Sequence, residues 1–321
     1  MKRYLPLFAS AAICAALPVS AQEAKTYPAP SEIVAAAKAE DWVAIAPSDL
    51  LVMNLAPDSK GKSRRVVIQL MPAPFSQGWV SNIRKLAAAH WWDGTSINRV
   101  QDNYVVQWGD ATEKKALPEG LAVVPESAYV SKAPWITVRE LPFSEPANAA
   151  AAEAAKLEDW IPRDIIAAGV GFEQGWTFAT DHKSYWPIHC YGMVGVGRNL
   201  SPDTGTGAEL YTVIGHAPRH LDRNIALVGR VIEGIEHMSS LPRGTGALGF
   251  YEKEEERVPI LSVRLGNAGK DVPAFEYLST DSDSFAAYAD ARANRRDAFF
   301  NIPAGGADIC NIPVPIRRKA N

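Results

Sequence analysis

The sequence predicts a mainly β fold made of antiparallel strands. Short segments rich in β-branched and aromatic residues alternate with turn signals made of Gly, Pro, Asp and Asn. Two pairs of these segments lie close enough along the chain to form hairpins. A segment between the two pairs has its apolar residues at helical spacing. We therefore expect the fold to start as two hairpins joined by a helix.

The first 21 residues are predicted to be a signal peptide. Lys2–Arg3 supplies a positive start, Leu5–Leu17 a short apolar run, and Val19–Ala21 a small-residue cleavage site. The apolar run is shorter than the roughly 20 residues that span a bilayer. We expect an exported bacterial protein, periplasmic or secreted, with no membrane anchor after cleavage.

Composition is that of an ordinary globular chain of 321 residues. Losing the positive charges of Lys2 and Arg3 takes the net charge from −3 to −5, so no excess of positive charge indicates nucleic-acid binding. The mature chain keeps Cys190 and Cys310. In an oxidising compartment two cysteines can form a disulfide. The alternative is two buried thiols, because cysteine is among the most buried residue types.

The first hairpin is preceded by a short helical lead. Ser31–Trp42 is predicted to be helical, with Ser31 as its N-cap. Leu50–Leu55 and Arg65–Leu70 follow as two strands around a polar turn at residues 58–61. Ser76 is expected to cap the joining helix, whose apolar face is formed by Trp79, Ile83 and Leu86.

The second hairpin contains a cation between apolar neighbours. Its first strand is predicted at Ile97–Val100, and its second strand starts at Tyr104 after the Asp102-Asn103 turn. Arg99 lies in the first strand. A buried cation costs free energy unless it is paired or used. The alternative is a structural arginine whose stem packs while its head reaches solvent.

The stretch from Trp91 to Asp110 resembles the central motif of the cyclophilins, a family of peptidyl-prolyl cis/trans isomerases. The matching residues keep the order and spacing of the family motif: Trp92-Asp93-Gly94, Arg99-Val100, Tyr104-Val105-Val106-Gln107 and Gly109-Asp110. Three positions depart from it. Ile97 stands where many members have Phe, Asn98 where they have His, and Trp108 replaces the first of two Gly.

A second stretch, Cys190–Leu265, resembles the later part of the same family. The matches are the strands Met193–Val196, Ala208–Val213 and Leu227–Gly234, the Leu221-Asp222 turn, a second helix at Ile235–Leu241 and a closing strand at Val258–Leu265. Glu209 stands where the family has Gln, and Ile225 stands where many members have a His that touches substrate.

The resemblance implies a closed eight-stranded antiparallel barrel capped by two helices, a form without exposed sheet edges. The barrel domain is expected at residues 48–267, after an N-terminal lead at 22–47. A helical insertion at 111–186 and a C-terminal extension at 268–321 lie outside the family pattern.

The insertion and the extension are predicted from local signals alone. In the insertion, Trp135–Val138 is strand-like, Ala147–Lys156 is helix-forming, and Asp164–Gln174 is ambiguous. In the extension, Ser282–Arg296 is predicted to be an amphipathic helix capped near Ser282 or Ser284, and Asn301–Arg318 an extended surface segment.

The resemblance also implies isomerase (rotamase) activity on proline-containing polypeptides, assisting the folding of exported proteins. Rotation about an X-Pro peptide has a barrier of about 18–20 kcal/mol. No bond is broken, so neither a metal nor a cofactor is expected. At the twisted geometry the prolyl nitrogen regains a lone pair, which a fixed hydrogen-bond donor stabilises. Arg99 has that role by resemblance, and Gln107 is expected to hold Arg99 and the substrate carbonyl.

Further substrate contacts follow from the same resemblance. An apolar pocket for the proline ring would be formed by Tyr104, Val105, Tyr211 and Leu221. Plain barrel core is the alternative role for these residues. Glu209 either pairs with Arg99 and blunts its donation, or helps to place it. Together with Ile225, Glu209 predicts lower activity than in members with the full set. The rival function is a non-catalytic prolyl-peptide-binding or chaperone module.

Two other motifs are weighed and set aside. Asp203–Thr206 spells the aspartic-protease triplet, but that chemistry needs two carboxylates sharing a proton and the sequence has no second copy, so a turn is predicted. His216 and His220 have metal-ligand spacing for a helix. Pro218 lies between them and argues against a helix, so surface histidines are predicted.

Overall fold

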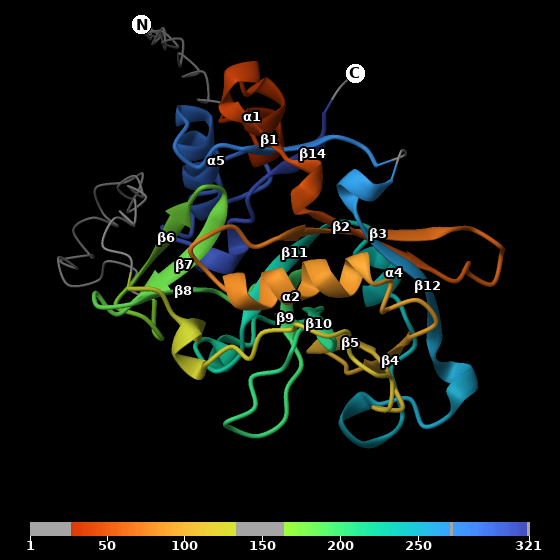
Figure 1. Ribbon diagram of the computed structural model, residues 1–321. Helices are drawn as coiled ribbons and strands as arrows, with labels where there is room; N and C mark the ends of the chain where they lie inside the picture. Colours follow the sequence, from red (N-terminus) through yellow and green to blue (C-terminus); the bar gives the residue numbers. More distant parts are fainter. Residues whose placement is uncertain (1–26, 133–163, 270–271, 320–321) are drawn as a thin grey trace, which may run out of the picture.

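The centre of the molecule is a closed barrel of eight antiparallel strands (Figure 1). This computed structural model describes residues 27–132, 164–269 and 272–319. The strand order is β10-β5-β4-β12-β2-β3-β11-β9, so the predicted barrel is confirmed. The strands are β2 (Leu50–Leu55), β3 (Arg64–Leu70), β4 (Ser96–Val100), β5 (Val105–Gly109), β9 (Met193–Val196), β10 (Leu210–Val213), β11 (Leu227–Glu233) and β12 (Val258–Leu265).

Three predicted segments lie outside the described residues. They are the signal peptide, the strand-like piece Trp135–Val138 and the helix Ala147–Lys156.

Alternation along the strands separates the barrel interior from its outer face. In β5, Val106 and Trp108 belong to the main buried core, whereas Val105 belongs to a separate apolar cluster. Because successive side chains of a strand point to opposite faces, Gln107 lies on the same outer face as Val105. The same alternation in β10 buries Leu210 in the core and places Tyr211 outside.

The helix α2 (Gln77–Ala88) joins the two hairpins, as predicted, and packs on the core. Its apolar face, formed by Trp79, Ile83 and Leu86, is fully buried. Ser76 occupies the N-cap position, but it has a φ of 55° and its side chain makes no capping hydrogen bond. The second helix, α4 (Glu236–Ser239), is shorter than the predicted Ile235–Leu241. Pro242 explains the early end, since a residue before proline is disfavoured in the α conformation.

The described part of the insertion contains a three-stranded sheet that the sequence analysis did not predict. Its strands are β6 (Gly169–Glu173), β7 (Trp176–Thr180) and β8 (Tyr185–Pro187), in that order (Figure 1). Within β7, Trp176 and Phe178 are buried with Thr177 between them, so a two-residue period was present in the sequence.

A half-buried arginine attaches this sheet to the barrel. Arg230 on β11 donates hydrogen bonds of 2.7 and 3.0 Å to the side-chain oxygen of Gln69 and one of 2.6 Å to the carbonyl of Gly175. Its guanidinium also lies 4.2 Å from the ring centroid of Trp176. Burial lowers the pKa of Arg230 to about 9.

The N-terminal lead and the C-terminal extension pack together beside the barrel (Figure 1). Strand β1 (Trp42–Ile45) pairs with β13 (Phe275–Leu278), which pairs with β14 (Ile316–Arg318). Helix α1 (Pro30–Ala36) packs on α5 (Asp283–Ala293).

The predicted lead helix Ser31–Trp42 is wrong at both ends. The helix starts at Pro30, whose fixed φ suits a first helical position, and Ser31 is not its cap. It ends at Ala36, and Trp42 begins a strand because it pairs with Leu278. The prediction for the extension is better: Ser282 caps α5 by accepting a 3.1 Å hydrogen bond from the Phe285 N–H.

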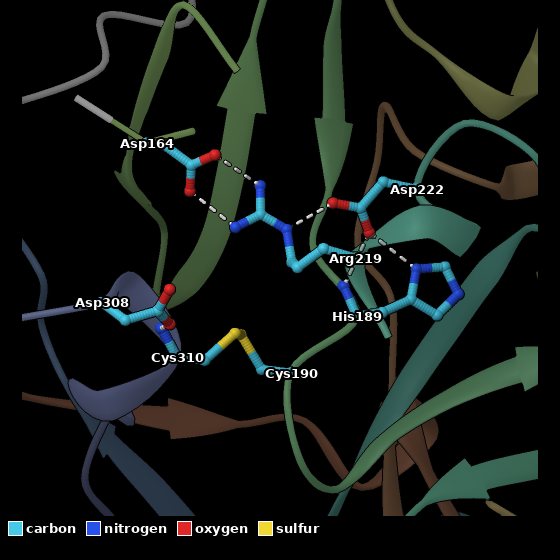
Figure 2. The surroundings of a disulfide bond; sticks show 7 residues. All are labelled: Asp164, His189, Cys190, Arg219, Asp222, Asp308 and Cys310. Atoms are coloured by element: carbon cyan, nitrogen blue, oxygen red, sulfur yellow. Dashed lines mark hydrogen bonds and ion pairs between the residues drawn. A yellow bond between two sulfur atoms is a disulfide. The ribbon is translucent and has the colours of Figure 1, made fainter. Parts of the chain in front are cut away.

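Cys190 and Cys310 form a disulfide across 120 residues of sequence (Figure 2). The two alternatives left open by the sequence are thereby decided. The bond ties the C-terminal extension to the segment just before β9.

Candidate active site

Arg99, Gln107 and Tyr211 form a row across three adjacent strands of the outer face. Arg99 on β4 is registered opposite Gln107 on β5, and Gln107 is registered opposite Tyr211 on β10. A register shift between Ile97 and Arg99 marks a bulge in β4. Bulges re-aim side chains, and this one directs Arg99 outward beside the buried Ile97.

Neutral acceptors hold the Arg99 guanidinium. Its Nε donates to the carbonyl oxygen of Leu248 at 2.8 Å, and its other nitrogens donate to Gln107 Oε1 at 3.1 Å and to the side-chain oxygen of Gln101. The guanidinium carbon also lies 5.7 Å from the ring centroid of Tyr104 and 5.3 Å from that of Phe250. Burial lowers the pKa of Arg99, although a guanidinium remains protonated in proteins.

Gln107 links Arg99 to Glu209. Gln107 and Asn98 donate side-chain hydrogen bonds to the Glu209 carboxylate, and the backbone N–H of Asp110 donates another. Glu209 therefore contacts Arg99 only through Gln107, and this geometry favours placement of the guanidinium over direct pairing. Burial raises the pKa of Glu209 to about 7, against the lowering effect of its hydrogen bonds.

The predicted pocket residues form one apolar cluster next to this row. Val105, Tyr211 and Val213 are its buried members, and three half-buried residues pack against them: Tyr104, Leu221 and Ile225. His220 stacks on the Tyr104 ring with the centroids 6.2 Å apart. The structure thus brings together all the residues predicted to contact a proline ring, as a packed surface.

Gln107 also lines a cavity of about 460 Å³. Its wall includes Asn98, Gln107, Asp110 and Glu209. The Oδ1 atom of Asn98 is buried and has no hydrogen-bond partner within the described residues.

The comparison with protein families shows which family the chain belongs to. Residues 61–265 match the model of the family described as cyclophilin type peptidyl-prolyl cis-trans isomerase/CLD. The chain belongs to the cyclophilin family.

One solved structure supports the fold of this cyclophilin, and two others have a weaker similarity. The crystal structure of cyclophilin AquaCyp293 from Hirschia baltica has a TM-score of 0.58 and 20% sequence identity, covering 87% of this chain and 95% of that one. A cyclophilin type isomerase from Cryptosporidium parvum, solved with and without the dipeptide Ala-Pro, has a TM-score of 0.36 in both structures. Those two structures have 9% and 10% identity, and cover 67% of this chain and 98% and 97% of theirs. No curated protein matches the chain.

Part of the site was not predicted from the sequence. Leu248 and Phe250, which contact Arg99, come from the loop that includes the turn η5 (Ala247–Gly249). An isolated bridge pairs Arg99 with Phe250 across about 150 residues of sequence. No local signal in that loop indicates such a contact.

The segment Asp203–Thr206 and the pair His216 and His220 are loop features. Asp203 accepts hydrogen bonds of 2.9 Å from the backbone N–H groups of both Asn199 and Gly205, so the turn interpretation is confirmed. His220 lies in the short turn η4 (Arg219–Leu221), and His216 precedes it in a loop. In the part of the chain that the structure describes, no helix has the length and apolar character needed to cross a bilayer.

Proposed function

We propose that this cyclophilin catalyses cis/trans isomerisation of X-Pro bonds in exported polypeptides, with Arg99 as the donor to the twisted prolyl nitrogen. The observation that carries the proposal is the position of Arg99. It is a cation held by neutral acceptors, on the same outer face as the apolar cluster of Tyr104, Val105 and Tyr211.

The donor capacity of Arg99 supports this role. A guanidinium has five N–H donors, and the described contacts use one on each of its three nitrogens. Two N–H groups therefore remain for a substrate. As the amide twists, its nitrogen regains a lone pair that accepts a hydrogen bond. That bond is stronger in the transition state than in either planar state, so the barrier falls.

The neighbouring residues would place the substrate. The proline ring would lie on the half-exposed apolar cluster, next to Tyr104 and Leu221. Gln107 accepts from Arg99 and donates to Glu209, so its amide orientation is set by both neighbours. Its second amide hydrogen is left to meet a peptide carbonyl.

An NMR exchange experiment on an Ala-Pro-containing peptide tests the proposal. Arg99→Ala is expected to slow catalysed exchange by about 10²-fold, the usual effect of removing one transition-state donor. Arg99→Lys keeps the charge but loses the fork of donors, so an intermediate rate is expected. Arg64→Ala is the matched control, because Arg64 donates to Ala56 on another strand pair. Equal rates for the wild type and Arg99→Ala would end the catalytic proposal.

A non-catalytic prolyl-peptide-binding module is the second candidate function. The packing of Tyr104, Leu221 and Ile225 over the buried members of the cluster favours it, because a packed surface binds a ring without enclosing it. This function predicts chemical-shift changes in the cluster on peptide addition, with an exchange rate equal to that of the free peptide.

Export is proposed from the predicted signal peptide and is supported by the disulfide. Structural disulfides persist mainly in oxidising compartments, and Cys190–Cys310 closes a loop of 120 residues. Expression in a bacterium followed by fractionation and mass measurement tests this. A periplasmic or secreted chain that begins at Gln22 is expected, and a cytoplasmic chain retaining Lys2 and Arg3 would contradict export.

A further inference from the structure

Tyr211 lies on the outer face of the barrel and extends across β9 to a buried histidine. Its ring crosses β9 over Gly195, where an added Cβ atom would lie 2.2 Å from the ring carbon Cζ. Only glycine at that position leaves room for the ring. Tyr211 is therefore 5% exposed, and its hydroxyl lies 2.8 Å from Nε2 of the fully buried His189.

His189 is held in one tautomer by Asp222. The Oδ1 atom of Asp222 lies 2.8 Å from His189 Nδ1 and accepts a 3.0 Å hydrogen bond from the His189 backbone N–H (Figure 2). Burial lowers the pKa of His189 in spite of the neighbouring carboxylate, so the ring is neutral. Its proton then lies on Nδ1, facing the carboxylate, and Nε2 accepts from the Tyr211 hydroxyl. Burial also raises the pKa of Tyr211, so the hydroxyl keeps its proton.

The second oxygen of Asp222 anchors the loop that carries the other half of the apolar cluster. Arg219 donates through Nε to Asp222 Oδ2 at 2.6 Å and through its terminal nitrogens to Asp164 at 2.6 and 3.2 Å (Figure 2). Leu221, which belongs to the cluster, lies between Arg219 and Asp222 in the chain. The backbone N–H groups of Asn224 and Ile225 both donate to the Leu221 carbonyl.

One buried set of hydrogen bonds thus controls two walls of the cluster. The Tyr211 ring comes from β10 and Leu221 from the turn η4, and Asp222 bonds directly to one side and through His189 to the other. Buried polar groups lose much free energy when left without partners. The distance between the two walls is therefore set by hydrogen-bond geometry in addition to apolar contact.

We propose that His189 and Asp222 are positioning residues that set the affinity of the apolar cluster for a prolyl residue. They act through Tyr211 and Leu221 and touch no substrate. The proposal rests on the proposed function in that the cluster is taken as the seat of the proline ring. His189 and Asp222 are expected to affect peptide affinity and not the hydrogen-bond donation by Arg99, because Gln107 lies between Arg99 and Tyr211.

Four variants test this assignment. His189→Leu removes both ring hydrogen bonds at similar volume, and His189→Gln keeps one donor and one acceptor. Tyr211→Phe removes only the hydroxyl and leaves the ring, and the fourth variant combines His189→Leu with Tyr211→Phe. For each, the Kd of an Ala-Pro peptide is measured by NMR titration, the exchange rate at saturating protein is measured separately, and urea unfolding reports stability.

His189→Leu and Tyr211→Phe are each expected to raise Kd about 5–10-fold, equivalent to about 1–1.4 kcal/mol. The exchange rate at saturation should change less than about twofold in His189→Leu, because Arg99, Gln107 and Tyr211 are all unchanged. His189→Gln should recover most of the affinity. The double variant should match the weaker single variant, since both substitutions break the same hydrogen bond.

Two results would overturn the proposal. One is a Kd unchanged in folded His189→Leu or Tyr211→Phe, with only the unfolding midpoint lowered, which is what a purely structural role gives. The other is full additivity in the double variant. If His189→Leu fails to fold, Tyr211→Phe and His189→Gln decide the question by the same Kd criterion. Failure of the proposed catalysis is distinguishable, because it appears as no effect of Arg99→Ala on exchange while the Kd series remains measurable.

Discussion

Arg99 and Arg219 lie on opposite sides of Tyr211 and have opposite surroundings. Arg99 is half-buried, and among the described residues its hydrogen-bond acceptors are the neutral groups of Leu248, Gln107 and Gln101. Arg219 is buried and lies between the carboxylates of Asp164 and Asp222. Burial lowers the pKa of Arg99, whereas for Arg219 hydrogen bonds to the two carboxylates outweigh burial and raise the pKa.

Arg99 therefore keeps its positive charge and spare N–H groups available for a substrate, whereas the charge of Arg219 is neutralised by two carboxylates. A guanidinium that stabilises a developing lone pair needs an uncompensated positive charge and unused N–H donors. Its own hydrogen-bond partners must therefore be neutral. A guanidinium that joins two loops is best neutralised, because buried charges cost free energy unless they are paired. The molecule uses the same side chain for both purposes, and the partners decide which one.

Replacing each arginine with methionine is expected to give the largest difference in unfolding free energy between two variants. Arg219→Met leaves two buried carboxylates without their cation and is expected to cost about 3–5 kcal/mol of unfolding free energy. Arg99→Met removes no ion pair and should cost less than about 1 kcal/mol, while exchange catalysis is lost. Urea unfolding of both variants checks this, and equal losses of stability would contradict the comparison.

Removing the disulfide tests how much this bond stabilises the region around Arg219 and His189, since Cys190 directly follows His189 in the chain. The Cys190→Ala, Cys310→Ala double variant is expected to lose about 2–4 kcal/mol of stability, because the bond closes a loop of 120 residues. Guanidinium chloride unfolding measures the loss. The wild type with a reductant should show a similar midpoint, and the variant should not respond to the reductant. A reductant effect on the variant would point to another cause.

Glu209, which is linked to Arg99 through Gln107, is expected to have a smaller, pH-dependent effect on the free energy of unfolding. Its pKa is about 7 in the folded state, above the ordinary value of 4.5, so the folded protein binds this proton more tightly than the unfolded chain. The cost of ionising it is absent below about pH 4.5, grows as pH rises towards 7 and is complete above it. Glu209→Gln should therefore stabilise the protein by about 1–3 kcal/mol at pH 8 relative to its effect at pH 4.5. Urea titrations at both pH values check this, and a pH-independent difference would show that the carboxyl is not perturbed.

The smallest expected effect concerns the rate of exchange. Glu209→Gln combined with Ile225→His restores the residue types of the family motif next to the Arg99 row. A rise in the exchange rate of about threefold is expected, equivalent to about 0.7 kcal/mol of barrier. The same NMR exchange assay measures it, with Ile225→Leu as the apolar control. No rise would mean that neither residue limits the reaction.

The pairing of Arg99 with Gln107 was predictable because its geometry is local. Arg99 and Gln107 belong to one hairpin, and a turn with a two-residue period sets which side chains share a face. The same holds for the apolar face of α2 and for Ser282 as the cap of α5. In these cases the residues that determine the structure lie within a few positions of one another.

The sequence by itself therefore determined the family, the barrel strands and the pairing of Arg99 with Gln107 in the row that carries the proposed chemistry. Only the tertiary structure decided the partners of that row. Leu248 meets Arg99, Asp222 meets His189 across 33 residues, and Cys190 meets Cys310 across 120. The strand pairing of Trp42 with Leu278 has the same origin. The physical reason is that such contacts arise from the closure and packing of the whole chain, and neither residue of the pair carries a local pattern that specifies the other.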